Sequence, residues 1–411
     1  MMKKKDNIII ITLFAVILLT LSIGSLIAKD REFSPNENRN LSQPSELSFD
    51  RVIDGRFEED AEKYVSDQIL ARDSWIEVKS VIKRLIGNKD INGVYLAEDG
   101  YYIEKTDEYE LDSEIYENNL KSIKSFFDDI SSYIPAEKLS VMLVPTAQNI
   151  LKDKLPKGVT TYDENGRLDE ACSVIEGDKL GGYNFIDLRD ALTQAASNNL
   201  QLYYRTDHHW TASGAFLGYG KLHEELDPKL GTSPREFEYV DASDRFLGTL
   251  YSKVLLPDTA YDTVQVIGDA GKGNSNSKAS AKETAKAMNG RYTVTADGKT
   301  LPGIYDMSKL KEKDKYAVFL GGNYGKAEIT GGPKNGRNLL LIKDSFANSL
   351  VPMLCGEYES ITMIDLRYFS GNLREYMKAQ KVNEVLVLYS MSNIITDKNL
   401  KMLDSTGVVL Q

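Results

Sequence analysis

A long uncharged run near the N-terminus places the strongest constraint on how this chain can fold. No charged residue occurs from Ile8 to Ala28, and the run follows the lysines at positions 3–5. About 20 apolar residues cross a bilayer as a helix, and lysines that flank the first such helix stay on the cytoplasmic side. We therefore expect residues 1–29 to form a cytoplasmic stub and a single-pass plasma-membrane helix, with the rest of the chain extracytoplasmic.

A cleaved signal peptide is the alternative interpretation of this run. Signal peptides have an apolar core of about 7–15 residues, followed by a small-x-small cleavage site. The triplet Ser22-Ile23-Gly24 offers a weak site of this kind, but the apolar run continues through Leu26 and Ile27. The length of the run therefore favours an uncleaved anchor.

Residues 30–110 are expected to form a stalk followed by a small helical and hairpin region. The stretch 30–50 is polar and rich in Asn and Ser, as in an extended stalk. Apolar residues then recur at helical spacing from Phe57 to Ile86, which predicts one or two amphipathic helices. The short apolar runs 93–96 and 101–103 flank a turn sequence and predict a hairpin.

Beyond residue 110, short apolar runs alternate with helical patterns. Such alternation predicts a parallel sheet covered on both faces, so we expect an α/β domain over 111–411. The predicted strands are 139–144, 183–188, 200–205, 316–320, 338–342, 360–364 and 384–389, and the predicted helices include 112–133, 212–226 and 346–354. This rhythm breaks at about 234–310, which we interpret as an insertion. It has β-like pieces at 263–267 and 291–296 and a mobile loop at 269–288 that is rich in Gly, Ser and Asn.

Composition argues against several classes of site and partner. The net charge of −11 disfavours nucleic acid or another anionic polymer as a bulk electrostatic partner, although it leaves room for a local basic groove. Cys172 and Cys355 lie in apolar helical contexts and predict buried thiols rather than a disulfide framework. The chain has no glycine-rich nucleotide fingerprint and too few His and Cys residues for a typical zinc site. We therefore expect no metal, no cofactor and no nucleic-acid partner.

Two of the three histidines in the chain are adjacent, in the segment Arg205-Thr206-Asp207-His208-His209-Trp210-Thr211. Histidine exchanges protons near neutral pH, so a pair beside a carboxylate in a chain so poor in histidine suggests a catalytic site. The alternative is that Asp207 caps a helix while the histidines pack or face solvent. The third histidine, His223, lies in a helical pattern and is interpreted as structural.

The second motif is a transition from strand to turn to helix around Ser345. An apolar strand ends at Lys343, a polar turn carries Asp344 and Ser345, and an apolar helical pattern begins at Phe346. Such a turn places a hydroxyl at the carboxyl edge of an open α/β sheet, where ligands bind. The free N–H groups of a helix N-terminus suit a developing oxyanion. The alternative is that Asp344 or Ser345 is only an N-cap.

Together the two motifs supply the parts of a nucleophilic triad. A serine hydroxyl needs a positioned base, and that base needs a partner that orients it and stabilises the imidazolium. Asp207 and His209 are two residues apart, so the carboxylate can reach Nδ1 and leave Nε2 for Ser345. We therefore predict Ser345, His209 and Asp207 as catalytic residues. We prefer His209 to His208 as the base, because adjacent residues rarely orient each other's rings as well.

Five further residues are candidates for binding the substrate or the oxyanion: Asn323, Gly322, Arg205, His208 and Gln148. Gly322 and Asn323 follow a predicted strand, where glycine lets the backbone approach a ligand closely and the amide can donate to an oxyanion. Gln148 follows the first predicted strand of the sheet, and Arg205 could contact a glycan or a carboxylate. An ordinary glycine turn and an ordinary helix start are the alternatives at 322–323 and at 148.

The two motifs resemble those of the DHHW family of bacterial exported proteins. This family is similar to the AlgJ/AlgX-like alginate O-acetyltransferase branch of the SGNH-hydrolase superfamily. The resemblance rests on Asp207-His208-His209-Trp210-Thr211 and on Lys343-Asp344-Ser345-Phe346-Ala347-Asn348. The segments 33–39, 246–253 and 321–324 support it, so it extends over nearly the whole exported chain.

The resemblance implies a fold and an activity. The fold is an SGNH-like (flavodoxin-like) three-layer α/β architecture with a parallel sheet. In the acetyltransferase branch an Asp-x-His-Trp segment supplies the acid and the base, and a later serine is the nucleophile; by motif these are Asp207, His209 and Ser345. The implied activity is transfer of an acyl group, most of all acetyl, to hydroxyls of an exported or cell-envelope polysaccharide. The implied partner is a membrane-bound O-acyltransferase that passes the acyl group outward. A carbohydrate esterase with the same triad and a non-catalytic scaffold for envelope assembly are the alternatives.

Overall fold

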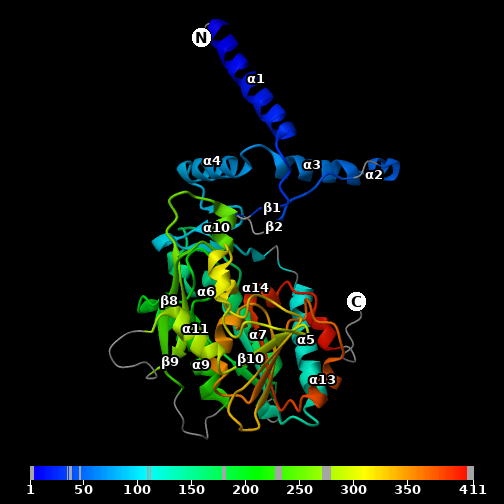
Figure 1. Ribbon diagram of the computed structural model, residues 1–411, viewed down its shortest axis with the longest axis vertical. Helices are drawn as coiled ribbons and strands as arrows, with labels where there is room; N and C mark the ends of the chain where they lie inside the picture. Colours follow the sequence, from blue (N-terminus) through cyan, green and yellow to red (C-terminus); the bar gives the residue numbers. More distant parts are fainter. Residues whose placement is uncertain are drawn as a thin grey trace. The chain divides into compact units, whose positions relative to one another are not determined.

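The chain folds into two compact units. A computed structural model (Figure 1) describes residues 4–34, 36, 39–45, 48–108, 111, 113–177, 182–226, 234–270 and 279–404. The first unit contains the residues up to 92 together with 251–259, and the second contains 93–250 and the residues from 260 onward. The boundaries expected from the sequence, 1–29, 30–110 and 111–411, stay a prediction. Part of the segment 33–39 that supports the family resemblance lies outside the described residues.

The first unit consists mainly of helices. They are α1 (Lys4–Ile27), α2 (Phe49–Ile53), α3 (Arg56–Gln68) and α4 (Arg72–Leu85), with the short strands β1 (Phe33–Ser34), β2 (Arg39–Asn40) and β3 (Asp90–Ile91). Within α1, residues Asn7–Ile27 are long and apolar enough to cross a membrane, as predicted. This property suits an anchor and a signal sequence equally. The amphipathic helices predicted between Phe57 and Ile86 are α3 and α4.

An eight-stranded sheet forms the centre of the second unit. In spatial order its strands are β11 (Lys299–Thr300), β10 (Thr293–Ala296), β12 (Lys326–Thr330), β14 (Ser360–Ile364), β13 (Asn338–Lys343), β15 (Glu384–Ser390), β6 (Leu139–Val144) and β7 (Asn184–Ile186). The strands from β14 to β7 are parallel, as predicted. β10, β11 and β12 pair in antiparallel fashion, so the sheet is mixed rather than wholly parallel.

Helices cover both faces of this sheet, which confirms the three-layer architecture. Successive side chains of a strand point to opposite faces: Met142 and Val144 of β6 belong to one buried cluster, and Val141 and Leu143 belong to the other. The first cluster includes residues of α9 (Ala212–Leu226) and α12 (Ala347–Leu354). The second includes residues of α5 (Ser113–Ile130), α7 (Glu164–Glu176) and α13 (Leu373–Ala379). Burial of both faces explains why these strands are almost entirely apolar.

The remaining elements connect these layers. The strands are β4 (Val94–Leu96) and β5 (Tyr102–Glu104), which form the predicted hairpin, and the antiparallel pair β8 (Phe237–Phe246) and β9 (Asp262–Asp269). The helices are α6 (Ala147–Ile150), α8 (Arg189–Ser197), α10 (Thr249–Val254), α11 (Ala281–Asn289) and α14 (Met391–Ile394).

Two predicted strands are wrong. The stretch 200–205 contributes only an isolated bridge between Tyr203 and Trp210. Its backbone bonds mostly within its own loop, and its one bond to a strand runs from the N–H of Tyr102 to the oxygen of Arg205 (2.7 Å). The stretch 316–320 is mostly the 3₁₀ turn η6 (Lys315–Val318), and the positive φ of Leu320, 63°, interrupts an extended run there. The strand that pairs with β14 at this edge of the sheet is β12, which the sequence pattern did not predict.

The region expected as an insertion is only partly separate from the sheet. β8 and β9 pair with each other, whereas β10 and β11 are strands of the central sheet. The loop predicted at 269–288 is wrong over its second half, which forms α11. This helix begins with a capping box in which Ser280 and Glu283 bond each other's backbone N–H groups. Residues 271–278 of the predicted loop lie outside the described residues.

Two glycines of α9 make room for Trp210, whose side chain is fully buried. A Cβ at Gly218 would lie 2.9 Å from Cη2 of Trp210, and a Cβ at Gly214 would lie 2.4 Å from the backbone oxygen of Leu202. Gly220, in the same helix, has no atom within 4 Å of such a Cβ. Substitutions at Gly218 and Gly220 therefore separate the effect of packing from that of helix propensity.

We expect Gly218→Ala to destabilise the protein and Gly220→Ala to stabilise it. Replacing glycine by alanine inside a helix favours folding by about 0.5–1 kcal/mol, and at Gly220 nothing opposes this gain. At Gly218 the added methyl group displaces the Trp210 ring, and overpacking of this kind costs about 1–3 kcal/mol. Urea unfolding of the two variants measures both effects. Equal stabilisation by the two substitutions would contradict the tight packing around Trp210.

Candidate active site

The segment from Asp207 to Trp210 lies in a short loop before α9. Two backbone bonds close this loop: the N–H of Tyr204 donates to the oxygen of His209 (3.1 Å), and the N–H of Thr211 donates to the oxygen of Leu202 (2.8 Å). The carboxylate of Asp262, at the start of β9, accepts hydrogen bonds from the residues that precede Asp207. Its four donors, at 2.7–3.0 Å, are the backbone N–H groups of Arg205 and Thr206, the Thr206 hydroxyl and the Gln201 amide. Burial raises the pKa of Asp262, and these hydrogen bonds oppose that rise.

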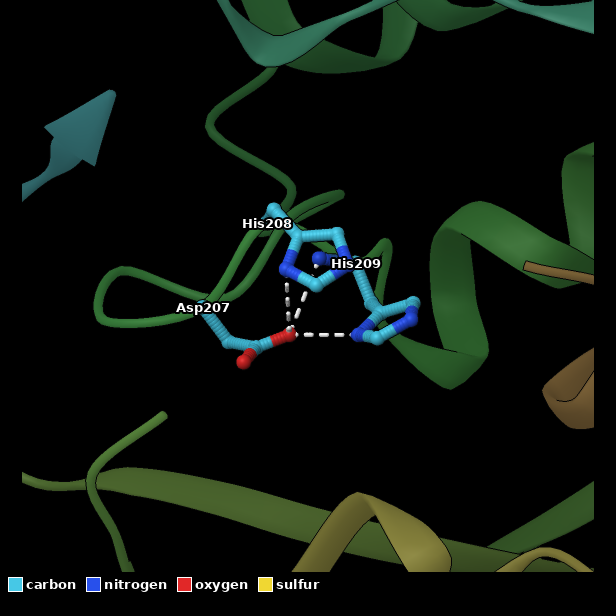
Figure 2. Close-up of side chains that lie close together, drawn as sticks. All are labelled: Asp207, His208 and His209. Atoms are coloured by element: carbon cyan, nitrogen blue, oxygen red, sulfur yellow. Dashed lines mark hydrogen bonds and ion pairs between the residues drawn. The ribbon is translucent and has the colours of Figure 1, made fainter. Parts of the chain in front are cut away.

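The carboxylate of Asp207 is buried and bonded at both oxygens. One oxygen accepts from the backbone N–H and from ring Nδ1 of His209, at 3.0 and 2.5 Å (Figure 2). The other accepts from the backbone N–H and the hydroxyl of Thr249, at 2.8 and 3.0 Å. Burial alone would raise the pKa of Asp207, but the two neighbouring imidazoles and these hydrogen bonds outweigh it and hold the pKa well below its usual range. Gly248 permits the approach, since a Cβ there would lie 2.3 Å from that of Asp207.

His209 lies between Asp207 and Ser345 and contacts both. Its Nδ1 is 2.5 Å from the carboxylate, and its Nε2 is 2.7 Å from Oγ of Ser345. Because Nδ1 faces an acceptor, it carries the proton of the neutral ring, which leaves Nε2 as an acceptor for the hydroxyl. Burial lowers the pKa of His209 to about 4; His208 acts in the same direction and Asp207 opposes it. The ring is therefore neutral at physiological pH and able to accept a proton.

Ser345 lies in the turn between β13 and α12, at the carboxyl end of a strand inside the parallel part of the sheet. Asp344 shapes this turn. One of its oxygens accepts from the N–H of Phe346 at 2.9 Å, and the other accepts at 2.7–2.8 Å from the N–H and hydroxyl of Ser390 and from the amide of Asn393. Ser345 is largely buried, with 9% of its surface exposed.

Two aromatic residues connect the base and the nucleophile. Nε1–H of Trp210 donates to the backbone oxygen of Phe346 at 2.9 Å. Tyr316, from η6, stacks on the ring of His209 with centroids 3.8 Å apart and planes at 9°. The hydroxyl of Tyr316 donates to the backbone oxygen of Ser345 at 2.9 Å. The orientation of the imidazole and the position of the serine backbone are therefore fixed by the same tyrosine.

Asn323 lies beside the Ser345 turn with its amide oriented. Its Oδ1 accepts from Nζ of Lys343 at 2.9 Å and from Nδ2 of Asn348 at 3.1 Å. Asn323 itself is exposed, and the other end of its amide, Nδ2, is a hydrogen-bond donor. Burial lowers the pKa of Lys343 to about 8, and Asp365, at 3.7 Å from Nζ, opposes this. Gly322 has a φ of 134°, a conformation that favours glycine before Asn323.

His208 lies beside His209 but does not occupy the position between the carboxylate and the serine. Its Nδ1 is 2.7 Å from Oγ1 of Thr249 and 3.8 Å from Asp207. The two imidazole centroids are 3.9 Å apart, and Figure 2 shows both rings turned toward the same oxygen of Asp207. Thr249 therefore links His208 to the carboxylate that orients His209.

The ligand atoms of Asp207, His208 and His209 lie within 4.8 Å of one another, a spacing that a metal ion can use. An ionised carboxylate accepts at about four lone-pair positions, and four N–H and O–H donors already point at Asp207. A cation bound there would have to displace some of these donors. The arrangement therefore suits proton transfer better than metal binding, and the expectation of no metal or cofactor stays a prediction.

Two of the candidate binding residues bond to the protein itself. Gln148 exchanges two hydrogen bonds with the backbone of Thr106, at 3.0 and 3.2 Å. Arg205 donates to the backbone oxygen of Asp99 at 3.1 Å and to Gln201 at 2.9 Å. These contacts hold residues near the β4–β5 hairpin, and a substrate-binding role for Gln148 or Arg205 stays a prediction.

Three residues at the site were not singled out from the sequence. Thr249 lies in the segment 246–253 that supports the family resemblance, and that segment was the available signal for it. Asp262 begins a strand inside the expected insertion, a region that the sequence analysis did not connect with the site. Tyr316 lies in a stretch predicted as a strand, and no local pattern distinguishes it from a core tyrosine.

Comparison with known protein families supports an SGNH hydrolase-like relationship. A family model described as the SGNH hydrolase-like domain of the acetyltransferase AlgX matches residues 105–288. This range contains Asp207 and His209 and ends before Ser345. The comparison with curated proteins finds no match.

Solved structures share the fold. A DHHW family protein from Eubacterium siraeum is 20% identical; the match covers 78% of this chain and 98% of that one, with a TM-score of 0.57. PatB1 from Bacillus cereus, solved with a sulfonyl adduct, is 22% identical; the match covers 78% and 100% of the two chains, with a TM-score of 0.57. At these identities the likeness is one of fold. Together with the family match it confirms the resemblance predicted from the two motifs: the chain has an SGNH-like α/β fold, and its residues 105–288 are similar to the SGNH hydrolase-like domain of the acetyltransferase AlgX.

Proposed function

We propose that the chain transfers an acyl group, most of all acetyl, to hydroxyls of an exported or cell-envelope polysaccharide through an ester on Ser345. One observation carries the proposal: Nδ1 of His209 lies 2.5 Å from Asp207 while Nε2 lies 2.7 Å from Oγ of Ser345. An alcohol, an imidazole and a carboxylate linked in this order activate a serine nucleophile. Acetyl is preferred because the matching family model describes an acetyltransferase.

The first half-reaction loads the serine. Oγ of Ser345 attacks the carbonyl carbon of the acyl donor while its proton passes to Nε2 of His209. The tetrahedral intermediate collapses by breaking the bond between that carbon and the leaving atom of the donor, which takes the proton from His209. Asp207 keeps Nδ1–H oriented and stabilises the transient imidazolium. The products are the Ser345 ester and the protonated leaving group.

The second half-reaction unloads the serine onto the acceptor. A sugar hydroxyl gives its proton to Nε2 of His209 and attacks the ester carbon. Collapse of this intermediate breaks the bond to Oγ of Ser345, which takes the proton back. The serine and the neutral imidazole are regenerated, and the acyl group is now an ester of the sugar. Water in place of the sugar hydroxyl would make the same machinery an esterase.

Asn323 is proposed as a donor to the oxyanion in both halves. Lys343 and Asn348, from the strand and the helix on either side of Ser345, bond its Oδ1 and so orient the amide, whose Nδ2 is a donor. A donor held in advance stabilises developing charge without the cost of reorienting during the reaction. We propose the backbone N–H of Ser345 as a second donor, because the N–H of Phe346 already donates to Asp344.

The acyl donor is proposed to come from a membrane partner. Acetyl-CoA is cytoplasmic, whereas α1 suits an anchor that leaves the rest of the chain on the outer face. A membrane-bound O-acyltransferase that passes the acyl group outward would supply the donor where this chain is held. The plasma membrane is therefore the proposed location, with α1 as a single-pass anchor.

Acyl trapping tests the proposal. Incubation of the purified protein with p-nitrophenyl acetate should attach an acetyl group to Ser345, detected by peptide mass spectrometry, and release nitrophenolate. Ser345→Ala should abolish both, and His209→Ala should slow nitrophenolate release by about 10²–10⁴-fold, the range for a general base. Ser131→Ala, which removes an exposed hydroxyl bonded to the oxygen of Asp128, is the matched control and should behave as the unchanged protein.

The fate of the trapped acetyl group separates transfer from hydrolysis. Adding an oligosaccharide prepared from cell-envelope polysaccharide should speed the loss of the Ser345 ester and yield acetylated sugar. Release as free acetate alone would favour the esterase. An acetyl adduct at another residue in Ser345→Ala, with nitrophenolate still released, would contradict the triad itself.

The pH dependence of Ser345 acylation should follow the lowered pKa of His209. The base works only when neutral, so the rate should be constant from pH 7 to about 5 and fall at lower pH, with a midpoint near the pKa of about 4. An ordinary histidine would lose activity near its usual pKa of about 6.5. Stopped-flow measurement of nitrophenolate release, read at its isosbestic wavelength, gives the profile. A midpoint at 6.5 or above would show that burial does not control the base.

Asn323→Ala should lower the rate of Ser345 acylation by about 10²–10³-fold, the usual effect of removing one oxyanion donor. Because Oδ1 of Asn323 accepts from the buried Lys343 and Asn348, the free energy of unfolding should also fall, by about 1–3 kcal/mol, and the rate is therefore measured where the variant is fully folded. Asn198→Ala, at the exposed C-cap of α8, is the matched control. An unchanged rate in Asn323→Ala would assign the oxyanion to backbone donors alone.

A further inference from the structure

The helices of the first unit expose many large apolar side chains. Between residues 49 and 86 these are Phe49, Val52, Ile53, Val65, Leu70, Trp75, Val78, Ile82, Leu85 and Ile86. In the described part of the second unit, Leu200 is the only exposed Val, Leu or Ile. Large contiguous apolar patches are rare on soluble monomers and mark surfaces that meet a partner or a membrane.

The orientation of α4 shows that this exposure is systematic. Trp75, Val78, Ile82 and Leu85 recur every three or four residues, which places them on one face of the helix. They are 45–78% exposed, whereas the buried residue of α4 is Ser80, on the opposite side. The helix therefore directs a polar position toward the protein and its apolar stripe outward, the reverse of a helix that packs on a soluble core.

The exposed apolar surface continues onto α1. The end of α1 is bonded to the end of α3, since the N–H of Leu70, just after α3, donates to Oγ of Ser25 in the last turn of α1 (2.8 Å), and the hydroxyl of Tyr64 in α3 donates to Asp30, just after α1 (3.0 Å). An apolar groove of about 520 Å³ lies between the two helices. Its large apolar lining residues are Leu18, Leu21 and Leu26 from α1 and Val65 and Ile69 from α3.

We infer that α2, α3 and α4 lie on the outer leaflet of the bilayer. The apolar stripe of α4 and the exposed apolar residues of α2 and α3 would then lie among the acyl chains, and lipid would fill the groove beside α1. The backbone groups of a helix bond to one another, so a helix can lie in the interface without unsatisfied polar groups. An amphipathic helix with Trp on its apolar face and charges on the other is typical of this position. Trp75 lies within the stripe, and Glu77 and Arg84 lie on the opposite face of α4.

Continuity with α1 favours a bilayer over a protein as the occupant. The groove is lined from one side by the last turns of a helix that is long and apolar enough to cross a membrane. A bilayer covers α1, the groove and the stripe as one apolar phase, whereas a protein partner would have to cover the stripe and leave α1 to lipid. The part of α4 outside the stripe carries both acidic and basic residues, among them Glu77, Lys79 and Arg84, so a zwitterionic lipid suffices.

Tryptophan fluorescence tests this inference on the full chain. The sequence has two tryptophans, Trp75 in the stripe and Trp210, which is fully buried. In nanodiscs of phosphatidylcholine brominated on its acyl chains, we expect the emission of Trp75 to be quenched several-fold relative to unbrominated lipid. Trp75→Phe, which leaves Trp210 alone, should show little quenching. Aqueous iodide should quench neither tryptophan.

Charged substitutions in the stripe should prevent Trp75 from inserting among the acyl chains. Val78→Asp combined with Ile82→Asp alters exposed positions, so the fold and the emission of Trp210 should be retained while bromolipid quenching of Trp75 is lost. Leu200→Asp, an exposed apolar position of the second unit, is the matched control and should keep the quenching. The inference would be overturned if iodide quenched the emission of Trp75 and bromolipid did not. The stripe would then be a surface for binding a protein partner. Shielding from both quenchers would overturn the inference in favour of contact between copies of the chain.

Discussion

The candidate site depends on two hydrogen bonds that join segments 136 residues apart: Nε2 of His209 with Oγ of Ser345, and Nε1–H of Trp210 with the backbone oxygen of Phe346. The helices that follow these segments, α9 and α12, pack against each other on one face of the sheet. Their N-terminal ends therefore lie at the same edge of the sheet. The indole of Trp210 sits against Gly214 and Gly218 of α9, so the packing of one helix onto one ring sets the position of the nucleophile relative to its base.

Most of the fold could be predicted because its strands are buried on both faces. β6, β13, β14 and β15 are largely apolar runs, interrupted inside by Ser140 in β6 and Thr362 in β14, and the sequence marks them almost to the residue. The failures have a common physical cause. The pattern of β12 alternates between buried and partly exposed positions over only five residues, so it lacks such a run. The stretches 200–205 and 316–320 are apolar because they pack around the site, and burial alone does not distinguish a packed loop from a strand.

The sequence predicted that Asp207, His209 and Ser345 would lie together because their chemistry is rare in this chain, whereas it did not predict the residues that support them. An Asp-x-His pair in a sequence with three histidines is conspicuous. Tyr316, Thr249 and Asp262 are ordinary residue types, and they act through contacts across 40 to 110 positions that no local spacing reveals. A sequence shows which groups can do chemistry; only the folded chain shows which groups hold them in place.

Three buried aspartates share the task of holding the site. Asp207, Asp262 and Asp344 each accept four hydrogen bonds, and the donors always include backbone N–H groups of the loops that carry the reacting residues. A buried carboxylate left without donors would be costly, so each loop is constrained to the one arrangement that satisfies its aspartate. The three carboxylates therefore restrict the conformations of these loops and fix the positions of the residues that the loops carry. Fixed dipoles and hydrogen bonds of this kind, already oriented before a substrate arrives, are what stabilises charge as it develops in acyl transfer.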